Sequence, residues 1–211
     1  MIGSLDELSL SYNGGKDCLV LLILYLTALH TRATTDNLTI PPALRSVYII
    51  SPHPFPQVTT FVDTSAVQYH LSLTRYDLPM KAAFAAYLES DPRLRAIFVG
   101  TRRTDPHGAD LQPFDPTDRG WPEFMRVHPV IDWHYAEIWL FIREVGVEYC
   151  SLYDEGYTSL GGTEDTHPNP LLKVGGRETT TGHDPGGGGK FRPAYELTED
   201  EEERLGRDGA A

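Results

Sequence analysis

One short segment of the chain has the residue types of a phosphate-binding loop: it reads SYNGGKDC and begins at Ser11. Its adjacent glycines, Gly14 and Gly15, let a ligand approach the backbone closely, so that successive amide N–H groups can converge on an anion. Ser11 and Asn13 add side-chain hydrogen bonds, and Lys16 adds a positive charge. We therefore expect these five residues to bind the phosphates of a ligand.

The residue that follows this loop allows two interpretations. Asp17 stands at the start of a long apolar stretch, where a helix would direct its positive end toward an anion. Alternatively, the segment is a plain strand-to-helix turn in which Asp17 is the helix N-cap. The pattern G-x-x-x-x-G-K-[ST] is absent, so this is not a Walker A loop.

A pair of arginines gives a second candidate anion site. Arg102 and Arg103 lie in the stretch VGTRRTDPH, directly after an apolar run that is typical of a buried strand. Guanidinium groups bind phosphate through two parallel hydrogen bonds, which favours this function in an otherwise acidic chain. The alternative is a surface pair in ion pairs with nearby acids.

A tryptophan close to an aspartate indicates a site for a flat heteroaromatic ring. Trp121 can stack on such a ring while the Asp118 carboxylate accepts a hydrogen bond from a ring N–H. Trp133 precedes a predicted helix, and we expect it in the core instead. Near the C-terminus Arg204 and Arg207 are three residues apart, so both would point the same way on a helix. From composition alone, that tail is a solvated charged segment.

Composition narrows the classes of partner. The 211 residues include 18 Lys and Arg against 30 Asp and Glu, a formal net charge of −12, which argues against a nucleic-acid partner. The apolar stretch at 19–29 is shorter than the roughly 20 residues that cross a membrane. Two cysteines are too few for a disulfide framework or a four-thiolate zinc site. With no secretory signal visible, we expect a cytoplasmic protein without a membrane partner.

These candidate residues must be positioned by alternating strands and helices. Hydrophobic patterning predicts strands at 8–10, 45–51, 71–75 and 96–100, and helices at 17–29, 58–70, 81–89 and 135–145. We expect the first helix to be covered on all sides, 101–127 to be a long loop, and 175–190 to be mobile. The alternation predicts an α/β fold of three layers, α/β/α, around a mostly parallel sheet, with ligands at the carboxyl ends of the strands.

Several segments together closely resemble the eukaryotic, fungal-type FAD synthases (FMN adenylyltransferases). They are SYNGGKDC, GTRRTDP, the block TDRGWPEFMRVHPVIDW, YCSLYDEGYTSLG, and the C-terminal arginine pair. The loop is a variant of the pyrophosphate-binding loop of N-type ATP pyrophosphatases, and the family shares its fold with the phosphoadenylyl-sulfate reductases. The resemblance implies an adenine nucleotide alpha hydrolase-like fold, a modified Rossmann-like architecture, in a single domain over 1–211. Its core would span about 5–172, a mobile segment about 173–192, and a flavin- or phosphate-clamping tail 193–208.

The resemblance also implies a reaction, ATP + FMN → FAD + pyrophosphate, with Mg²⁺, in a protein we expect to be a monomer. The expected catalytic residues are Asn13, Asp17, Arg102 and Asp105. The expected ATP and phosphate ligands are Ser11, Asn13, Gly14, Gly15, Lys16 and Arg102. The expected flavin-binding residues are Asp105, Asp118, Trp121, Arg204 and Arg207. Asp17 is either an indirect metal contact or a helix cap, and no direct metal ligand is assigned.

Two other functions remain open at this point. A thiol-dependent sulfate reductase would need a C-terminal cysteine nucleophile, but the last cysteine is Cys150. A flavin or nucleotide sensor without catalytic activity would keep the same binding residues. Release of pyrophosphate distinguishes the enzyme from the sensor.

Overall fold

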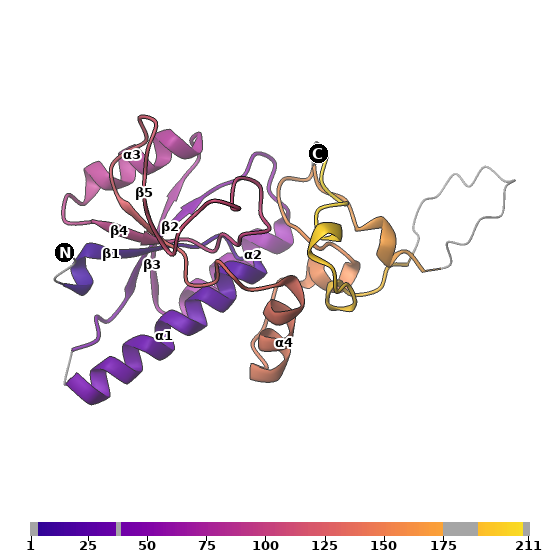
Figure 1. Cartoon of the computed structure of the whole chain (residues 1–211), viewed down its shortest axis with the longest axis horizontal. Coiled ribbons are helices and arrows are strands. Elements are labelled where there is room, and N and C mark those ends of the chain that lie inside the picture. Colours follow the sequence, from indigo (N-terminus) through magenta and orange to yellow (C-terminus); the bar gives the residue numbers. More distant parts are fainter. Residues whose placement is uncertain (1–3, 37–38, 175–189, 209–211) are drawn as a thin grey trace, which may run out of the picture.

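A six-stranded sheet forms the centre of the computed structural model, which describes residues 4–36, 39–174 and 190–208 (Figure 1). Its strands are β1 (Leu8–Ser11), β2 (Leu44–Ile49), β3 (Leu71–Tyr76), β4 (Ala96–Phe98), β5 (Phe114–Pro116) and β6 (Met125–Val127). Their order is β3-β2-β1-β4-β6-β5, and every neighbouring pair is parallel except β5 and β6. This confirms the predicted mostly parallel sheet.

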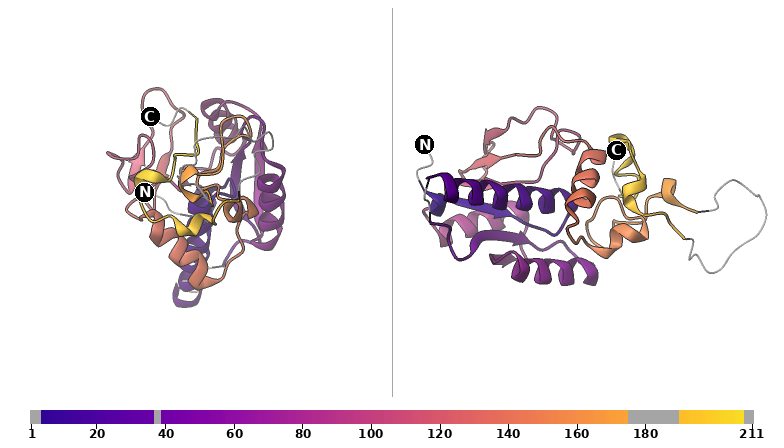
Figure 2. Two further views of the ribbon diagram at one scale, coloured as in Figure 1. Left: turned by 90° about the vertical axis from the view of Figure 1, so that its right-hand side faces the viewer. Right: turned by 90° about the horizontal axis from the view of Figure 1, so that it is seen from below.

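Helices cover both faces of this sheet, as predicted (Figure 2). They are α1 (Lys16–Asp36), α2 (Pro56–Gln68), α3 (Met80–Ser90) and α4 (Tyr135–Val145). Because side chains alternate along a strand, Tyr48 of β2 packs in one core cluster with α1, α2 and α4, whereas Val47 packs with α3 on the opposite face. Five short 3-10 helices complete the described structure, at Leu5–Glu7, Ser151–Glu155, Pro170–Leu172, Ala194–Glu196 and Asp200–Glu202.

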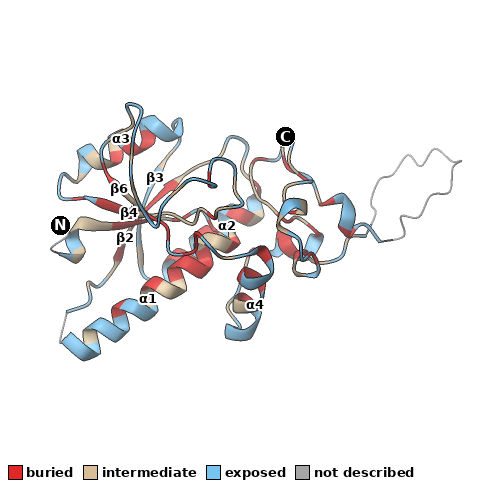
Figure 3. Ribbon diagram, in the orientation of Figure 1, coloured by how far each residue is buried: buried red, intermediate tan, exposed pale blue. Residues whose placement is uncertain are grey.

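The first helix is longer and less enclosed than predicted. Leu19 to Leu22 are buried, but Thr27, Ala28 and most later residues except Leu29 are exposed, so burial is concentrated in the half nearest the site (Figure 3). The expectation of a helix covered on all sides is therefore wrong for its second half. By length and composition alone α1 is apolar enough to cross a membrane, but so are core helices of soluble proteins, and its first half packs in the core.

The stretch from 101 to 127 contains two strands where the sequence predicts only loop. β5 and β6 have three residues each, which is too short for a detectable periodicity. They form because β6 pairs with β4, and β5 adds an antiparallel edge strand. By contrast, α4 ends as predicted: Gly146 adopts a left-handed backbone with φ of 71° and closes the last turn.

The last described residues fold back toward the start of α1. Lys173 pairs with Phe191 in an isolated bridge, and Arg207 pairs with Thr166 in another. Ala194 and Leu197 are buried in the same core cluster as α1 and α4. The expected mobility of 175–190 concerns residues that, except for Lys190, lie outside the described ranges.

Candidate active site

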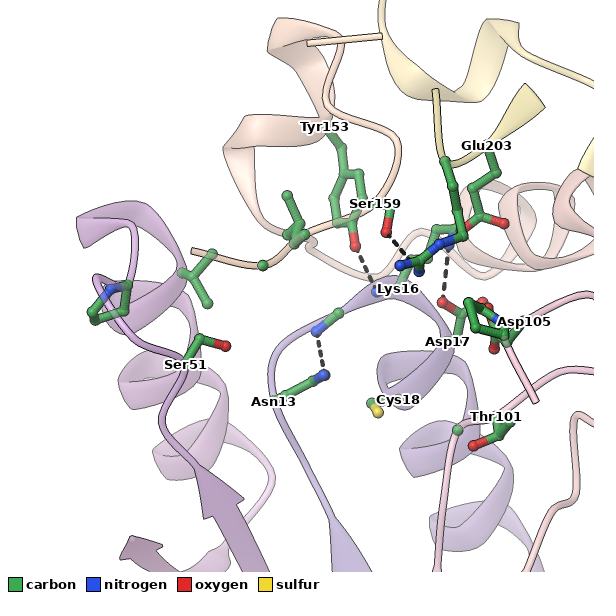
Figure 4. A pocket seen from close by; sticks show the side chains of 18 of the residues that line it. Asn13, Lys16, Asp17, Cys18, Ser51, Thr101, Asp105, Tyr153, Ser159 and Glu203 are labelled. Atoms are coloured by element: carbon green, nitrogen blue, oxygen red, sulfur yellow. Dashed lines mark hydrogen bonds and ion pairs between the residues drawn. The ribbon is translucent and has the colours of Figure 1, made fainter. Parts of the chain in front are cut away.

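The carboxyl ends of β1 and β4 diverge because the chain leaves β1 toward β2 and β3 and later returns on the other side to form β4. Such a switch point is where open α/β sheets bind ligands. A cavity of about 270 Å³ lies there, between the loop after β1, the Gly100–Thr101 segment after β4, residues 159–161, and Glu203 and Arg204 of the tail (Figure 4). We call it the loop cavity.

The loop after β1 is held in shape by its own contacts. Gly14 has φ of +75°, and a Cβ there would lie 2.8 Å from Val62, so only glycine fits without strain. The Gly15 N–H donates to Asn13 Oδ1 at 2.9 Å, and the Lys16 N–H donates to the Tyr153 hydroxyl at 2.9 Å. Two of the amides expected to converge on phosphate therefore have protein partners in this conformation.

Lys16 and Arg102, expected as phosphate ligands, form a buried ion cluster instead of pointing freely into the cavity. Arg102 is 0% exposed and Lys16 is 2% exposed. Arg102 Nε lies 2.8 Å from Asp17 Oδ1, and Lys16 Nζ lies 2.9 Å from Asp17 Oδ2. Both cations also pair with Glu203 of the tail, one with each carboxylate oxygen. Their role as phosphate contacts stays a prediction.

Burial and charge act against each other in this cluster. Burial would lower the pKa of Lys16 and of Arg102, but Asp17 and Glu203 outweigh it and raise both pKa values. Burial also raises the pKa of Glu203, and the charge of Lys16 only partly counteracts that rise. Each charge therefore depends on its partners, which makes removal of one member more disruptive than removal of a balanced pair.

The carboxylates of Asp17 and Asp105 have different surroundings. Asp17 lies within the first turn of α1, which begins at Lys16, and its oxygens face Lys16 and Arg102. The interpretation of Asp17 as N-cap is therefore wrong, because its side chain is used in the ion cluster. Asp105 Oδ2 accepts the Arg102 backbone N–H at 2.8 Å, and Asp105 lines the loop cavity. The described residues contain no group of three or more His, Cys, Asp or Glu suited to a metal ion.

A second cavity, of about 250 Å³, contains the predicted ring-binding pair. Asp118 and Trp121 line it together with Ser11, and Thr101 lines both cavities. The tight turn from Asp118 to Trp121 uses positive φ at Arg119 and Gly120, and it closes with the Trp121 N–H donating to Asp118 O at 2.9 Å. We call this the aromatic cavity. Ser11, predicted with the phosphate loop, therefore lies on the aromatic side.

The C-terminal arginines have different partners. Residues 203–206 form turns, and Arg207 already pairs with Thr166, so the two arginines do not lie on a helix. Arg207 packs against Gly161 and its guanidinium lies 3.0 Å from Asp165. Arg204 lines the loop cavity, 3.5 Å from Ser159 Oγ, and its Nε is buried without a partner. Arg204 and Asp105, both predicted to bind flavin, thus lie in the loop cavity.

Sequence analysis did not single out Thr101, Tyr153 or Glu203 as site residues. Thr101 lies three residues after the end of β4, at the edge where ligands bind, and that position was the available signal. Tyr153 and Glu203 reach the loop from 137 and 187 residues away in the chain, and no local pattern reports such a contact.

The comparisons with known proteins agree on one family. The phosphoadenosine phosphosulfate reductase domain family matches residues 7–168. The probable FAD synthase of Schizosaccharomyces pombe is 41% identical over 202 residues, covering 96% of this chain and 72% of that protein. The probable FAD synthase of Caenorhabditis elegans is 36% identical over 208 residues, which are 37% of its own length.

Among solved structures, Candida glabrata FMN adenylyltransferase in complex with FMN and the ATP analogue AMPCPP has a TM-score of 0.86 at 33% identity, covering 96% of this chain and 81% of that one. The phosphoadenylyl-sulfate reductase of Candida auris, at 20% identity and a TM-score of 0.52, shares the fold alone. Fold and domain match together define an α/β domain of the phosphoadenosine phosphosulfate reductase class. Within that class, the chain belongs to the FAD synthase family of nucleotidyltransferases.

Proposed function

We propose that the protein transfers the adenylyl group of ATP to FMN, giving FAD and pyrophosphate. The observation that carries this proposal is the wall shared by two chemically different cavities. The loop cavity is lined by polar and charged groups, the aromatic cavity by Trp121, Asp118 and apolar side chains, and Thr101 belongs to both. A reaction between two bound phosphate-bearing substrates needs such adjacent sites, because their reacting phosphates must meet in line.

In this proposal the loop cavity binds ATP. Of the two cations that line it, Lys16 is paired with carboxylates, whereas Arg204 has no carboxylate partner among the described residues. A guanidinium group with free N–H donors is suited to a phosphate. We therefore assign Arg204 to the polyphosphate, together with the loop residues Asn13, Gly14 and Gly15. Arg207 supports the wall behind Gly161 and holds Asp165.

The aromatic cavity would bind the flavin. Trp121 is partly exposed on the cavity side and packs against Phe84 at a ring-centroid distance of 6.5 Å, so its position is fixed before a ligand arrives. The Asp118 carboxylate is exposed and can accept a hydrogen bond from a ring N–H. A flat ring placed there would direct a phosphate-bearing chain toward Thr101 and the loop cavity.

No general base is required by this reaction. The second pKa of a phosphate monoester is about 6, so FMN presents an anionic oxygen at neutral pH. That oxygen attacks the α-phosphorus of ATP and pyrophosphate leaves. The protein must position the two phosphates and offset their charge. His128 lines the aromatic cavity, but burial lowers its pKa, and its Nδ1–H donates to Gln112 O at 2.9 Å. We assign it a structural role.

Mg²⁺ would enter with ATP, since this ion is usually held by substrate phosphates, several waters and only one or two carboxylates. The residues fit that mode better than a closed protein cage. Asp17 and Asp105 both line the cavity, but both Asp17 oxygens pair closely with cations, at 2.9 and 2.8 Å. Asp105 is the better candidate for a contact with the ion or its water shell, because its Oδ1 lies 3.9 Å from Arg102. When bound, the ion would offset the charge that develops on the departing pyrophosphate.

We further propose a cytoplasmic monomer that forms one domain over 1–211, with its core at about 5–172 and a clamping tail at 193–208. Burial of Ala194 and Leu197 in the main core supports one domain. The free thiols of Cys18 and Cys150 are consistent with a reducing compartment.

The test is incubation of purified protein with ATP, magnesium and FMN, with FAD measured by chromatography and pyrophosphate by a coupled assay. We expect equal amounts of both products. Arg204→Ala should lower kcat/KM for ATP by about 10²-fold, the typical loss for one oriented charge stabiliser. The matched control is Arg192→Ala, directly before the tail and paired with exposed Glu196, which should stay close to wild type. Flavin binding without products would indicate a sensor, and absence of flavin binding would overturn the proposal.

A further inference from the structure

A single glutamate of the C-terminal tail is enclosed by the two buried cations of the site. Glu203 is 5% exposed, and its Oε1 and Oε2 accept from Lys16 Nζ and from a terminal nitrogen of Arg102. Figure 4 shows the Glu203 side chain directed toward the start of α1, where Lys16 and Asp17 lie. Glu203 therefore joins the loop after β1, the segment after β4 and the tail at one point.

Both cations of this cluster are paired with carboxylates of the protein. Lys16 faces Asp17 and Glu203, and Arg102 faces these two carboxylates as well as Asp105 and Asp200. For either cation to contact a phosphate, a buried ion pair would have to open and leave Glu203 buried without its partner, which is costly. The cations are therefore better explained as partners of Glu203 than as ligands of a substrate.

The next residue in the chain, Arg204, is the cation of the loop cavity that has no carboxylate partner among the described residues. The Arg204 side chain begins one peptide unit from Glu203, and its Nε is buried without a partner. The backbone around it is held as well: the Thr158 hydroxyl donates to Glu203 O at 2.5 Å, and Asn169 Nδ2 donates to Glu202 O at 2.8 Å. Because the backbone and the side chain of Glu203 are both fixed, the direction in which the Arg204 side chain leaves the backbone is restricted.

We propose that Glu203 is a positioning residue, held by Lys16 and Arg102, whose task is to direct the Arg204 guanidinium at the polyphosphate of the nucleotide. This inference rests on the proposed function for the identity of the ligand. It assigns Lys16 and Arg102 an indirect role, exerted through Glu203 and Arg204 instead of through contact with phosphate.

A double-mutant cycle tests this chain of action. The variants are Glu203→Gln, Arg204→Ala and the combination, compared by kcat/KM for ATP and by KM for FMN. We expect Arg204→Ala to lose about 10²-fold and Glu203→Gln at least about tenfold, while the combination is no worse than Arg204→Ala alone. KM for FMN should change little, since Glu203 does not line the aromatic cavity. The control is Glu201→Gln, the same change at an exposed position two residues earlier, which should match wild type.

Two results would overturn the inference: losses that multiply in the combined variant, or wild-type activity of Glu203→Gln. If Glu203→Gln does not fold, the charge-balanced Lys16→Met/Glu203→Gln replaces it in the cycle, because it removes one cation and one anion together. The affinity of the same variants for AMPCPP is also measured, by calorimetry. If the wild-type protein binds AMPCPP but forms no FAD, the proposed reaction fails, while the coupling between Glu203 and Arg204 is still measured.

Discussion

At the scale of single residues, Thr101 is the side chain common to both proposed substrate sites. It lines the loop cavity and the aromatic cavity, and within the described residues its hydroxyl has no hydrogen-bond partner. Its backbone is held in place because Gly100 packs closely on Cys18, where a Cβ would lie 2.9 Å from the sulfur. A fixed, unpartnered donor at this wall is suited to the oxygens of the two reacting phosphates.

We predict that Thr101→Val lowers kcat by about 10- to 10²-fold, with smaller changes in the KM values for ATP and FMN, because one oriented donor is lost at the reacting phosphates. Thr101→Ser keeps the hydroxyl and serves as the control, with activity close to wild type. Steady-state kinetics with each substrate varied in turn provides the measurement. A kcat of Thr101→Val within a factor of two of wild type would remove Thr101 from the reaction.

Residue types predicted which segments surround the cavity. They did not predict which groups the charged side chains pair with. The glycine-rich loop and the segment after β4 do meet at one cavity, because both follow neighbouring parallel strands, but Arg102 itself is buried beside the cavity. The ionic partners of Lys16 and Arg102 could not be predicted, since Glu203 is 187 and 101 residues away from them in the chain. The neighbouring residues in the sequence do not distinguish a buried, ion-paired cation from a cation that binds a ligand.

At the scale of elements, the tail supplies the helix cap of α4. Asp200 Oδ1 accepts the Tyr135 N–H at 2.7 Å, and Asp200 Oδ2 accepts from His134 Nδ1 at 2.6 Å. Burial raises the pKa of Asp200, but the His134 hydrogen bond and the Tyr135 amide outweigh it, so the net direction is down. The same hydrogen bond raises the pKa of His134. A carboxylate at a helix N-terminus is also favoured by the helix dipole.

Because of these two pKa shifts, the stabilisation of the tail by His134 and Asp200 is limited to a defined pH range. The raised pKa of His134 means that its contribution is complete below about 6.5 and is lost as the pH rises through the folded-state value. The lowered pKa of Asp200 means that its contribution is present above about 3.9 and is lost on acidification. The pair therefore stabilises the tail most at mildly acidic pH.

We predict that hydrogen exchange of residues 193–208 is faster at pH 8 than at pH 6 after correction for the intrinsic pH dependence. The change should be less than about fivefold, because His134 is exposed and solvent screens the pair. His134→Asn should remove this difference while leaving the Asp200 contact to Tyr135 intact. Equal pH dependence in both proteins would contradict a contribution from His134.

Long helices were predicted well. The short strands β5 and β6, which form only because they pair with a neighbouring strand, were not predicted. The predicted positions of α2, α3 and α4 match because each has a helical pattern over at least eleven residues. β5 and β6 depend on hydrogen bonds from β4 and from each other, and three residues carry no usable period. The three-residue spacing of Arg204 and Arg207 is likewise no guide to their directions, since Arg207 forms a bridge with Thr166 and the segment is not a helix.

At the scale of the whole molecule, the two cavities are separate enough to be disabled one at a time. We predict that Trp121→Ala loses the thermal stabilisation by FMN but keeps that by magnesium-ATP, and that Arg204→Ala does the reverse. Each ligand stabilises the native state by RT ln(1 + [L]/Kd), so loss of binding abolishes its own shift only. Differential scanning fluorimetry of each variant, with and without each ligand, provides the measurement. Loss of both shifts in Trp121→Ala, relative to its own ligand-free melting temperature, would argue for one undivided site.

The contact between Lys16 and Glu203 also fixes when, during synthesis, the site can exist. The two residues are 187 positions apart, so at about 5–20 residues per second the ribosome adds the glutamate roughly 10–40 seconds after the lysine. Until then the strands and helices of the nascent chain can form around a loop whose lysine lacks one of its two carboxylates. The buried ion cluster of Lys16, Arg102 and Glu203 can therefore form only after every strand of the sheet has been synthesised, because β6 ends at Val127 and Glu203 follows much later in the chain.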